Sequence, residues 1–260
     1  MAARRLLAAG AVFLNGCRCR VASRTVQPGD TVQVSSDAPP ATAPPLTILY
    51  EDDSVIAVDK PAGMPSAPTR QAAAGSAVDT LRTQLRARDG RPAALWVVHR
   101  LDADTSGVLV FARTQAAAAA LSQAFAAQQV DKTYLARVAG TVGEVESGTI
   151  DLPLRGEGRG TVVADDGKPA QTAWQVTERA ADSTLLTVRP RTGRLHQIRV
   201  HLHAIGHPVL GDRRYGGPPA PRLMLHAARV RLPHPTGHRY VDIEAPLPRA
   251  LSPQPAVPCP

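Results

Sequence analysis

Cysteine, lysine and long apolar runs are scarce in this 260-residue chain, and each shortage excludes a class of protein. The three cysteines, Cys17, Cys19 and Cys259, are too few and too oddly spaced for a disulfide framework, and none forms a Cys-x-x-Cys pair. No apolar run reaches the roughly 20 residues that a membrane-spanning helix needs. We therefore expect a protein of the reducing cytoplasm with no membrane partner.

Several catalytic motifs are also missing. Gly167 and Lys168 do not end a phosphate-binding loop, because position 162 is Val and a Pro follows the Lys. The sequence contains neither Gly-x-Ser-x-Gly nor His-Glu-x-x-His. His203 and His207 have the i, i+4 spacing of a zinc pair, but Gly206 between them and a following Pro should end any helix there. We expect no metal site.

The charge of the chain is strongly positive. Its formal net charge is +8, and all but three of the 30 basic residues are arginine. A polyanion is therefore a plausible partner. The preference for arginine over lysine follows the general compositional bias of an Ala- and Pro-rich chain, whereas the sign of the net charge does not depend on that bias.

Positions 99 to 107 read His-Arg-Leu-Asp-Ala-Asp-Thr-Ser-Gly. A lone Asp in such a loop usually forms a turn or a cap through its backbone contacts. As a block, however, the nine residues resemble the signature His-Arg-Leu-Asp-x-x-Thr-Ser-Gly of the RluA-type pseudouridine synthases. Asp102 occupies a specified position of that signature. Asp104 occupies an unspecified one and is predicted to be a turn cap.

Four further segments resemble that family, in the family's order, over about residues 47 to 245. They are Val-Asp-Lys-Pro-Ala-Gly from Val58, Lys-Thr-Tyr-Leu-Ala from Lys132, Thr-Gly-Arg-Leu-His-Gln-Ile-Arg from Thr192 with the following Gly211-Asp212, and Leu-Met-Leu-His-Ala from Leu223. The resemblance implies isomerisation of uridine to pseudouridine in structured RNA, with no cofactor and no metal.

The resemblance also implies roles for five residues. Asp102 matches the nucleophile, Arg199 its ion-pair partner, and Tyr134 the tyrosine that stacks on the target base. Arg100 matches the arginine that fills the gap left by the flipped uridine, since a base inside a helix is unreachable. Leu225 is expected beneath the base, although a plain core role fits it nearly as well. A carboxylate suits this chemistry because it can attack and leave again, at C1′ or at C6, and a nearby guanidinium stabilises its ionised form.

The order of elements predicts an α+β fold. Hairpin strands are expected at 47–50 and 55–58, helices at 115–127 and 195–205, and further strands at 130–138, 172–177, 184–188, 223–232 and 240–243. Mixed short strands with few helices favour a largely antiparallel sheet. The family resemblance implies a bent mixed sheet with a central RNA-binding cleft.

The remaining parts of the chain flank that catalytic domain, predicted at residues 47–246. Residues 1–35 resemble a truncated S4-type RNA-binding segment, although Arg4-Arg5 and the apolar run to Leu14 also resemble a short signal peptide. Residues 36–46 are predicted to form a stiff Pro-rich linker, and residues 247–260 a disordered Pro-rich tail. We expect a monomer.

Three functions are consistent with these features. The first is an isomerase acting on ribosomal RNA, with the large subunit favoured by the S4-like segment, or on transfer RNA. The second is a catalytically silent RNA-binding or ribosome-assembly protein on the same fold; the intact Asp102, Tyr134 and Arg199 favour the enzyme. The third, a glycoside or nucleoside hydrolase using Asp102 and Asp104, is disfavoured because a charge of +8 suits a polyanion better than a neutral sugar.

Overall fold

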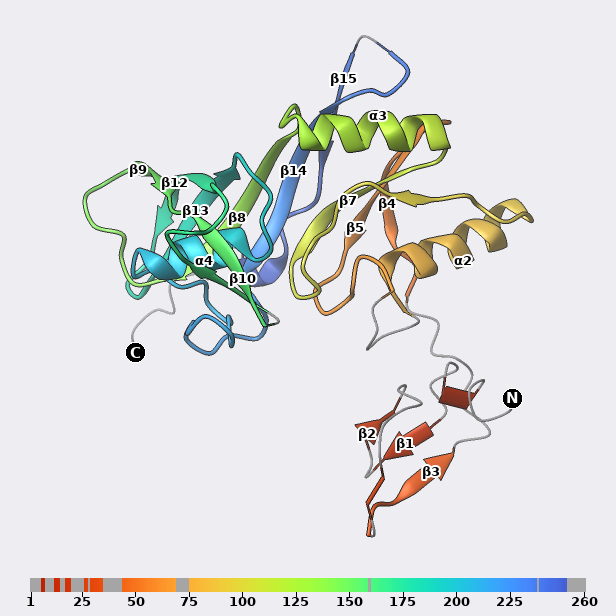
Figure 1. Ribbon diagram of the computed structural model, residues 1–260, viewed down its shortest axis with the longest axis horizontal. Coiled ribbons are helices and arrows are strands. Elements are labelled where there is room, and N and C mark those ends of the chain that lie inside the picture. Colours follow the sequence, from red (N-terminus) through yellow and green to blue (C-terminus); the bar gives the residue numbers. More distant parts are fainter. Residues whose placement is uncertain are drawn as a thin grey trace, which may run out of the picture. The chain divides into compact units, whose positions relative to one another are not determined.

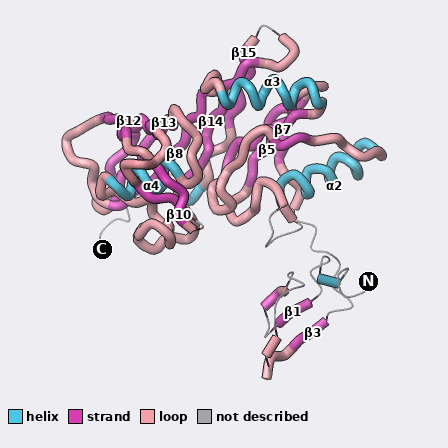
Figure 2. Tube along the Cα trace, in the orientation of Figure 1, coloured by secondary structure: helices cyan, strands magenta, loops and turns pink. Residues whose placement is uncertain are grey.

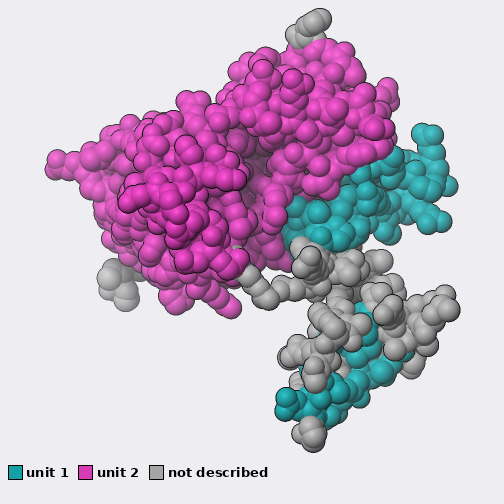
Figure 3. Space-filling view, in the orientation of Figure 1, with its two compact units in different colours: residues 1–46, 64–95 teal, residues 47–63, 96–260 magenta. Residues whose placement is uncertain are grey.

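A computed structural model gives the fold. It describes residues 6–7, 12–14, 17–19, 26–27, 29–34, 44–68, 75–158, 160–237 and 239–251. The chain divides into two compact units, of which unit 1 comprises residues 1–46 and 64–95 and unit 2 comprises residues 47–63 and 96–260 (Figure 3). The predicted catalytic domain therefore contributes to both units.

One large sheet dominates unit 2 (Figure 1). Within the described residues it has ten strands, with the order β4-β5-β7-β14-β8-β13-β12-β9, while β15 pairs with β14 and β6 with β7. All pairs are antiparallel except β7 with β14. The strands are β4 (Thr47–Glu51), β5 (Val55–Lys60), β6 (Trp96–Val97), β7 (Ser106–Ala112), β8 (Asp131–Ala139), β9 (Ser147–Asp151), β12 (Gln171–Arg179), β13 (Ser183–Pro190), β14 (Leu225–Pro233) and β15 (Tyr240–Glu244). This confirms the predicted mixed, largely antiparallel α+β fold.

Two helices of unit 2 pack on this sheet (Figure 2). Helix α3 (Gln115–Ala126) begins where the Thr114 side chain accepts a hydrogen bond from the Ala117 backbone N–H. Its buried Ala117 and Leu121 pack against alternate apolar residues of β5 and β7. Helix α4 (Gln197–Ala204) buries Ile198 and Leu202 against the other half of the sheet, around β8 and β13. Both helices confirm the predicted positions.

The parallel pair β7–β14 joins the two halves of the sheet, and a glycine permits it. Gly107 has a φ of 110°, and a Cβ at this position would lie 2.2 Å from the carbonyl oxygen of Ala227 on β14. No residue with a side chain fits this close backbone approach. The final Gly of the stretch at positions 99–107 is thus required by packing.

Three features of unit 2 were not predicted. The hairpin of β10 (Leu154–Glu157) and β11 (Gly160–Val163) forms a separate two-stranded sheet, and β9 adds an edge strand. The predicted disorder from residue 247 onward is wrong for its first residues, because Arg249–Leu251 form a 3-10 helix. Leu251 is fully buried, and its carbonyl accepts a hydrogen bond from Arg137. Residues 252–260 lie outside the described part.

Unit 1 contains helix α2 (Ala77–Asp89), for which the sequence analysis made no prediction, and a small sheet. Ser76 caps α2 by accepting from the Asp79 N–H and donating to the Asp79 carboxylate, and Gly90 ends it with a φ of 70°. The small sheet has the order β2-β1-β3, built from β1 (Val12–Leu14), β2 (Cys17–Arg18) and β3 (Val32–Val34). Its likeness to an S4 segment stays a prediction, and most of the predicted linker, residues 36–43, lies outside the described residues.

No helix in the described part of the chain is long and apolar enough to cross a membrane.

Candidate active site

The loop before β7 holds Asp102 in a tight turn. The Thr105 backbone N–H donates to the Asp102 carbonyl at 3.2 Å and closes the turn. The Lys60 ammonium, which is fully buried, supports it from beneath by donating to the carbonyls of Ala103 and Pro61, both at 2.9 Å. Burial lowers the pKa of Lys60 to about 8, so the ammonium is still mostly charged at neutral pH. These contacts fix the backbone of the turn that carries Asp102.

Arg199 brings a guanidinium to that carboxylate from helix α4. Its Nη1 lies 3.1 Å from Asp102 Oδ2, while its Nε and Nη2 form a bidentate pair with Asp212 at 2.7 and 2.8 Å. Asp212 is 1% exposed and also accepts the backbone N–H groups of Arg214 and Tyr215. Burial alone would raise the pKa of Asp212, but its hydrogen bonds and the charge of Arg199 lower it overall, so the carboxyl is ionised. One guanidinium therefore bridges two carboxylates.

A second group faces Asp102 from the start of α4. His196 has a φ of 54°, a left-handed conformation that is strained for a residue with a side chain. Its Nδ1 lies 2.8 Å from the Tyr215 hydroxyl, and its Nε2 lies 3.8 Å from Asp102 Oδ2. Burial lowers the pKa of His196, which favours the neutral imidazole. The Tyr215 ring lies beneath Arg199, with the guanidinium carbon 5.1 Å from the ring centre.

The loop that leads into α4 is held by one glutamine. The Gln197 side-chain oxygen accepts from the Thr192 hydroxyl at 2.7 Å and from the Arg194 N–H at 3.0 Å. Its amide nitrogen donates to the Gln171 carbonyl and the Thr172 hydroxyl. Because Gln197 is buried, these contacts fix the loop against the sheet and so fix where Arg199 points.

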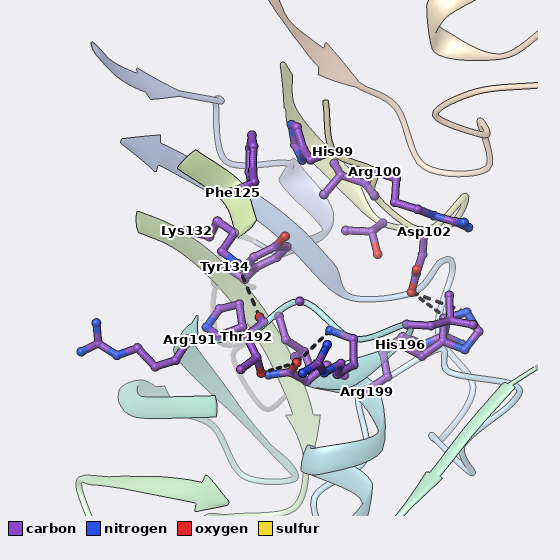
Figure 4. Close-up of a pocket in the computed structure, with 18 of the residues that line it drawn as sticks. His99, Arg100, Asp102, Phe125, Lys132, Tyr134, Arg191, Thr192, His196 and Arg199 are labelled. Atoms are coloured by element: carbon purple, nitrogen blue, oxygen red, sulfur yellow. Dashed lines mark hydrogen bonds and ion pairs between the residues drawn. The ribbon is translucent and has the colours of Figure 1, made fainter. Parts of the chain in front are cut away.

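Asp102, His196 and Arg199 line a cavity of about 580 Å³ in unit 2 (Figures 3 and 4). All five predicted site residues line it: Arg100, Asp102, Tyr134, Arg199 and Leu225. The volume falls in the range of small-ligand sites, and the mixture of an apolar wall with a few charged groups is typical of such sites. Asp104 does not line it.

The other residues that line the cavity differ in exposure and polarity. Leu225 is 3% exposed and forms an apolar wall, whereas Arg100 is exposed. Tyr134 is half-buried, and burial, with a smaller contribution from the charge of Asp102, raises its pKa, so the phenol stays protonated at neutral pH. The rings of His99 and Phe125 stack with their centres 4.6 Å apart and complete the cavity beside Arg100.

The expected cap at Asp104 is wrong. Asp104 is exposed, and among the described residues its carboxylate accepts no hydrogen bond. The turn is closed by the backbone of Asp102 and Thr105 instead. Asp104 therefore does not cap this turn by a hydrogen bond, although its charge opposes the lowering of the pKa of the buried Lys60.

The histidines of this region have separate roles. His201 is fully buried and bonds to the Thr172 hydroxyl and the Leu152 carbonyl, and His207 bonds to the Ala139 carbonyl. Helix α4 ends at residue 204, before His207, as its Gly and Pro neighbours predicted. His203 is exposed. Where the structure describes the chain, no group of three or more His, Cys, Asp or Glu is arranged to hold a metal.

Comparisons with known proteins show the family. A family model described as RNA pseudouridylate synthase matches residues 54–204. The dual-specificity RNA pseudouridine synthase RluA of Escherichia coli is 43% identical over 216 residues, covering 80% of this chain and 95% of the relative. The chain belongs to the RNA pseudouridylate synthase family.

Further members of the family resemble it in sequence and in fold. The ribosomal large subunit pseudouridine synthase D of Xanthomonas campestris is 39% identical over 254 residues, covering 87% of this chain and 75% of the relative. Two solved structures, human RNA pseudouridylate synthase domain containing 4 and 1, match with TM-scores of 0.65 at 26% and 29% identity. They cover 79% and 80% of this chain and 90% and 86% of their own.

Sequence reasoning missed part of this pseudouridine synthase site. Lys60 and Asp212 lie in segments that carry the family resemblance, yet no role was predicted for either. Nothing in the local sequence indicated that Lys60 is buried beneath the Asp102 turn or that Asp212 shares a guanidinium with Asp102. His196 and Tyr215 were missed for the same reason, since 19 residues separate two side chains that touch.

Proposed function

We propose that this RNA pseudouridine synthase converts specific uridines of structured RNA, large-subunit ribosomal RNA or transfer RNA, with Asp102 as the nucleophile. The observation that carries the proposal is the carboxylate of Asp102, held by Arg199 at 3.1 Å inside a cavity that Tyr134 and Leu225 also line. The proposal includes a monomer acting in the cytoplasm without metal or cofactor.

The reaction needs few participants. The N1–C1′ bond breaks, the base turns, and a C5–C1′ bond forms; C5 then loses a proton and N1 gains one. Nothing is oxidised, and no group enters or leaves overall. A nucleophile that attacks and later leaves, at C1′ or at C6, together with a site for proton movement, is sufficient.

The geometry supplies both. Arg199 holds the Asp102 carboxylate in place at 3.1 Å, because its own position is fixed by the bidentate pair with Asp212. Tyr134 lines the same cavity with a protonated phenol, which supports a role in stacking on the uracil and in assisting proton movement. Leu225 packs under the base.

Arg100 has the character needed for base flipping. It is exposed beside the cavity, next to Leu101, which is 5% exposed and anchors the loop. A guanidinium can stack on bases and pair with phosphates, so it can fill the gap that a flipped uridine leaves.

The substrate class has two supports. The net charge of +8 suits a structured RNA. In addition, the name of the Xanthomonas relative states that it acts on the large ribosomal subunit.

Tritium release tests the proposal. RNA labelled with tritium at C5 of uridine loses the label to water when C5 bonds to C1′. Wild-type protein should release tritium from ribosomal or transfer RNA, and mapping of pseudouridine should locate few sites. Asp102→Asn should bind RNA as wild type does but release no tritium, since an amide cannot attack.

Asp104→Asn is the matched control, because Asp104 is the neighbouring carboxylate and does not line the cavity. It should release tritium as wild type does. Release by Asp102→Asn with loss in Asp104→Asn would contradict the assignment. RNA binding by wild type without release from any RNA would instead favour a silent RNA-binding protein.

A further inference from the structure

A second cavity lies beside the first in unit 2. It measures about 420 Å³ and sits where β8 begins, where β13 ends and along part of β14. It shares four lining residues with the catalytic cavity, so the two are contiguous. The shared residues are Gln128, Lys132, Pro190 and Arg191.

This second cavity is strongly basic. Lys132 and four exposed arginines line it, against a single acidic residue, Asp131. The arginines are Arg189, Arg191, Arg229 and Arg231. Concentrating like charges destabilises a fold by self-repulsion, while it raises the local concentration of an anionic ligand.

Most of this charge is not neutralised by the protein. Arg229 is paired with Asp242 and, at 3.4 Å, with Glu244. Arg189 and Arg191 form no ion pair with any described residue, and Arg231 lies over the Tyr240 ring, 4.9 Å from its centre. The guanidinium groups of these three arginines are therefore available to an anion.

The strand register brings these side chains together. On β14, Arg229 and Arg231 are two residues apart and so point to the same face of the sheet. Arg229 and Arg231 pair with Thr133 and Asp131 of β8. Strand β8 also pairs with β13, and Arg189 lies near the end of β13. Strands β14 and β13, which lie on either side of β8, thus direct arginine side chains to one place.

The shared residues lead from this place to Asp102. Lys132 donates to the Thr192 carbonyl at 3.4 Å, at the start of the loop that ends at His196. In Figure 4, Arg191 extends from the same loop away from Asp102. An RNA strand with its target uridine in the catalytic cavity can therefore continue past Lys132 and Arg191 into the basic cavity.

We infer that the basic cavity binds backbone phosphates of the substrate RNA strand that adjoins the target uridine. The inference rests on the proposed function. An arginine guanidinium can donate two parallel hydrogen bonds to two oxygens of one phosphate. No aromatic residue lines the cavity, so it lacks the aromatic side chains on which successive bases usually stack. The contacts therefore set affinity and register rather than base identity.

Salt-dependent binding tests the inference. Wild type and the double variant Arg189→Ala/Arg231→Ala are titrated with a structured RNA substrate at several KCl concentrations. Each lost phosphate contact should reduce the slope of log K against log salt by about 0.7 to 0.9. The double variant should bind about tenfold more weakly at low salt, with the effect on turnover in KM rather than in kcat.

Arg249→Ala is the matched control, because Arg249 is exposed on the 3-10 helix and lines neither cavity. It should keep the wild-type slope. Arg189→Glu, measured with the same RNA after its thermal unfolding is shown to match wild type, should weaken binding more than Arg189→Ala does. The double variant should raise the KM for a substrate shortened to a few nucleotides around the uridine much less than it raises the KM for the long RNA.

Three outcomes would overturn the inference: an unchanged slope in the double variant, an equal loss in Arg249→Ala, or an equal loss on long and short RNA. Tight binding of inorganic phosphate that does not compete with RNA would also overturn it, in favour of a free anion. If wild type forms pseudouridine and the double variant binds RNA normally, the phosphate site is rejected but the proposed function is not. Absence of pseudouridine formation by wild type rejects the proposed function, whatever the slope.

Discussion

Asp212 should matter as much to activity as residues that line the cavity. Its carboxylate does not line the cavity, but it holds Arg199 through two hydrogen bonds of 2.7 and 2.8 Å in a fully buried setting. In Asp212→Asn, the amide NH₂ group would face the guanidinium donors and the charge would be lost. Arg199 would then be free to turn away from Asp102.

The magnitude follows from the geometry. Removing one partner of a buried ion pair costs about 3–5 kcal/mol. Arg199 keeps Asp102 as a partner at 3.1 Å, so we expect the lower end, about 3 kcal/mol. For a domain of this size, that lowers the melting temperature by about 6–12 °C. A shift of the guanidinium by about 1 Å should lower kcat about 100-fold, with little change in KM.

Tritium release and thermal unfolding measure the two effects. In an Arg199→Met background, Asp212→Asn should lower kcat much less than it does in wild type, because Asp212 acts through Arg199. Asp166→Asn is the matched control, since Asp166 pairs with Arg155 in an exposed ion pair and should leave both readouts near wild type. Wild-type kcat in Asp212→Asn, or an undiminished effect in the Arg199→Met background, would refute the reasoning.

Three further predictions follow from the site and its surroundings. Arg100→Ala should reduce tritium release from a folded stem-loop far more than from an unstructured oligonucleotide, because an unstacked base needs no flipping; equal losses on both would reassign Arg100 to backbone contact. Activity should persist in excess EDTA, since the proposed nucleophile Asp102 and its charge partner Arg199 are both side chains; a loss of activity that zinc restores would contradict this. Burial lowers the pKa of His99 to about 3 and that of His226 to about 4, so below pH 6.5 the unfolded chain binds protons that the folded protein does not. These two histidines should therefore add no pH dependence to stability above about pH 6.5, and each should lower stability by up to about 2 kcal/mol at pH 5. Denaturant unfolding of wild type and His99→Gln at neutral pH and at pH 5 measures this, and an equal loss of stability in the two proteins would count against it.

The order of the elements followed from local patterns in the sequence. The hairpin at residues 47–60 and the strands of residues 171–190 confirmed their predicted positions, because alternation of apolar residues and turn residues act over short range. Helix α4 ended where its Gly and Pro neighbours predicted. Helix α2 was missed although Ser76, Asp79 and Gly90 mark its two ends, because its buried positions are few among charged residues.

The residues of the cavity were also recognisable in the sequence. Asp102, Tyr134 and Arg199 lie in three short motifs that carry the resemblance to the family. The motifs do not specify which of these side chains lie close together in the folded chain. The approach of Arg199 to Asp102 spans 97 positions of the chain and depends on α4 packing against one half of the sheet while the Asp102 loop leads into the other.

Only the tertiary structure decided which groups support that pair. The charge of Lys60 is visible in the sequence, but its burial beneath the Asp102 turn depends on β5 lying beside β7. Asp212 and Asp102 share the Arg199 guanidinium because the loop that carries Asp212 returns to α4. The basic cavity exists because the register of β8 and β14 faces Arg229 and Arg231 to the same side. Side-chain chemistry is local to the sequence, whereas burial and charge pairing arise from contacts between distant segments.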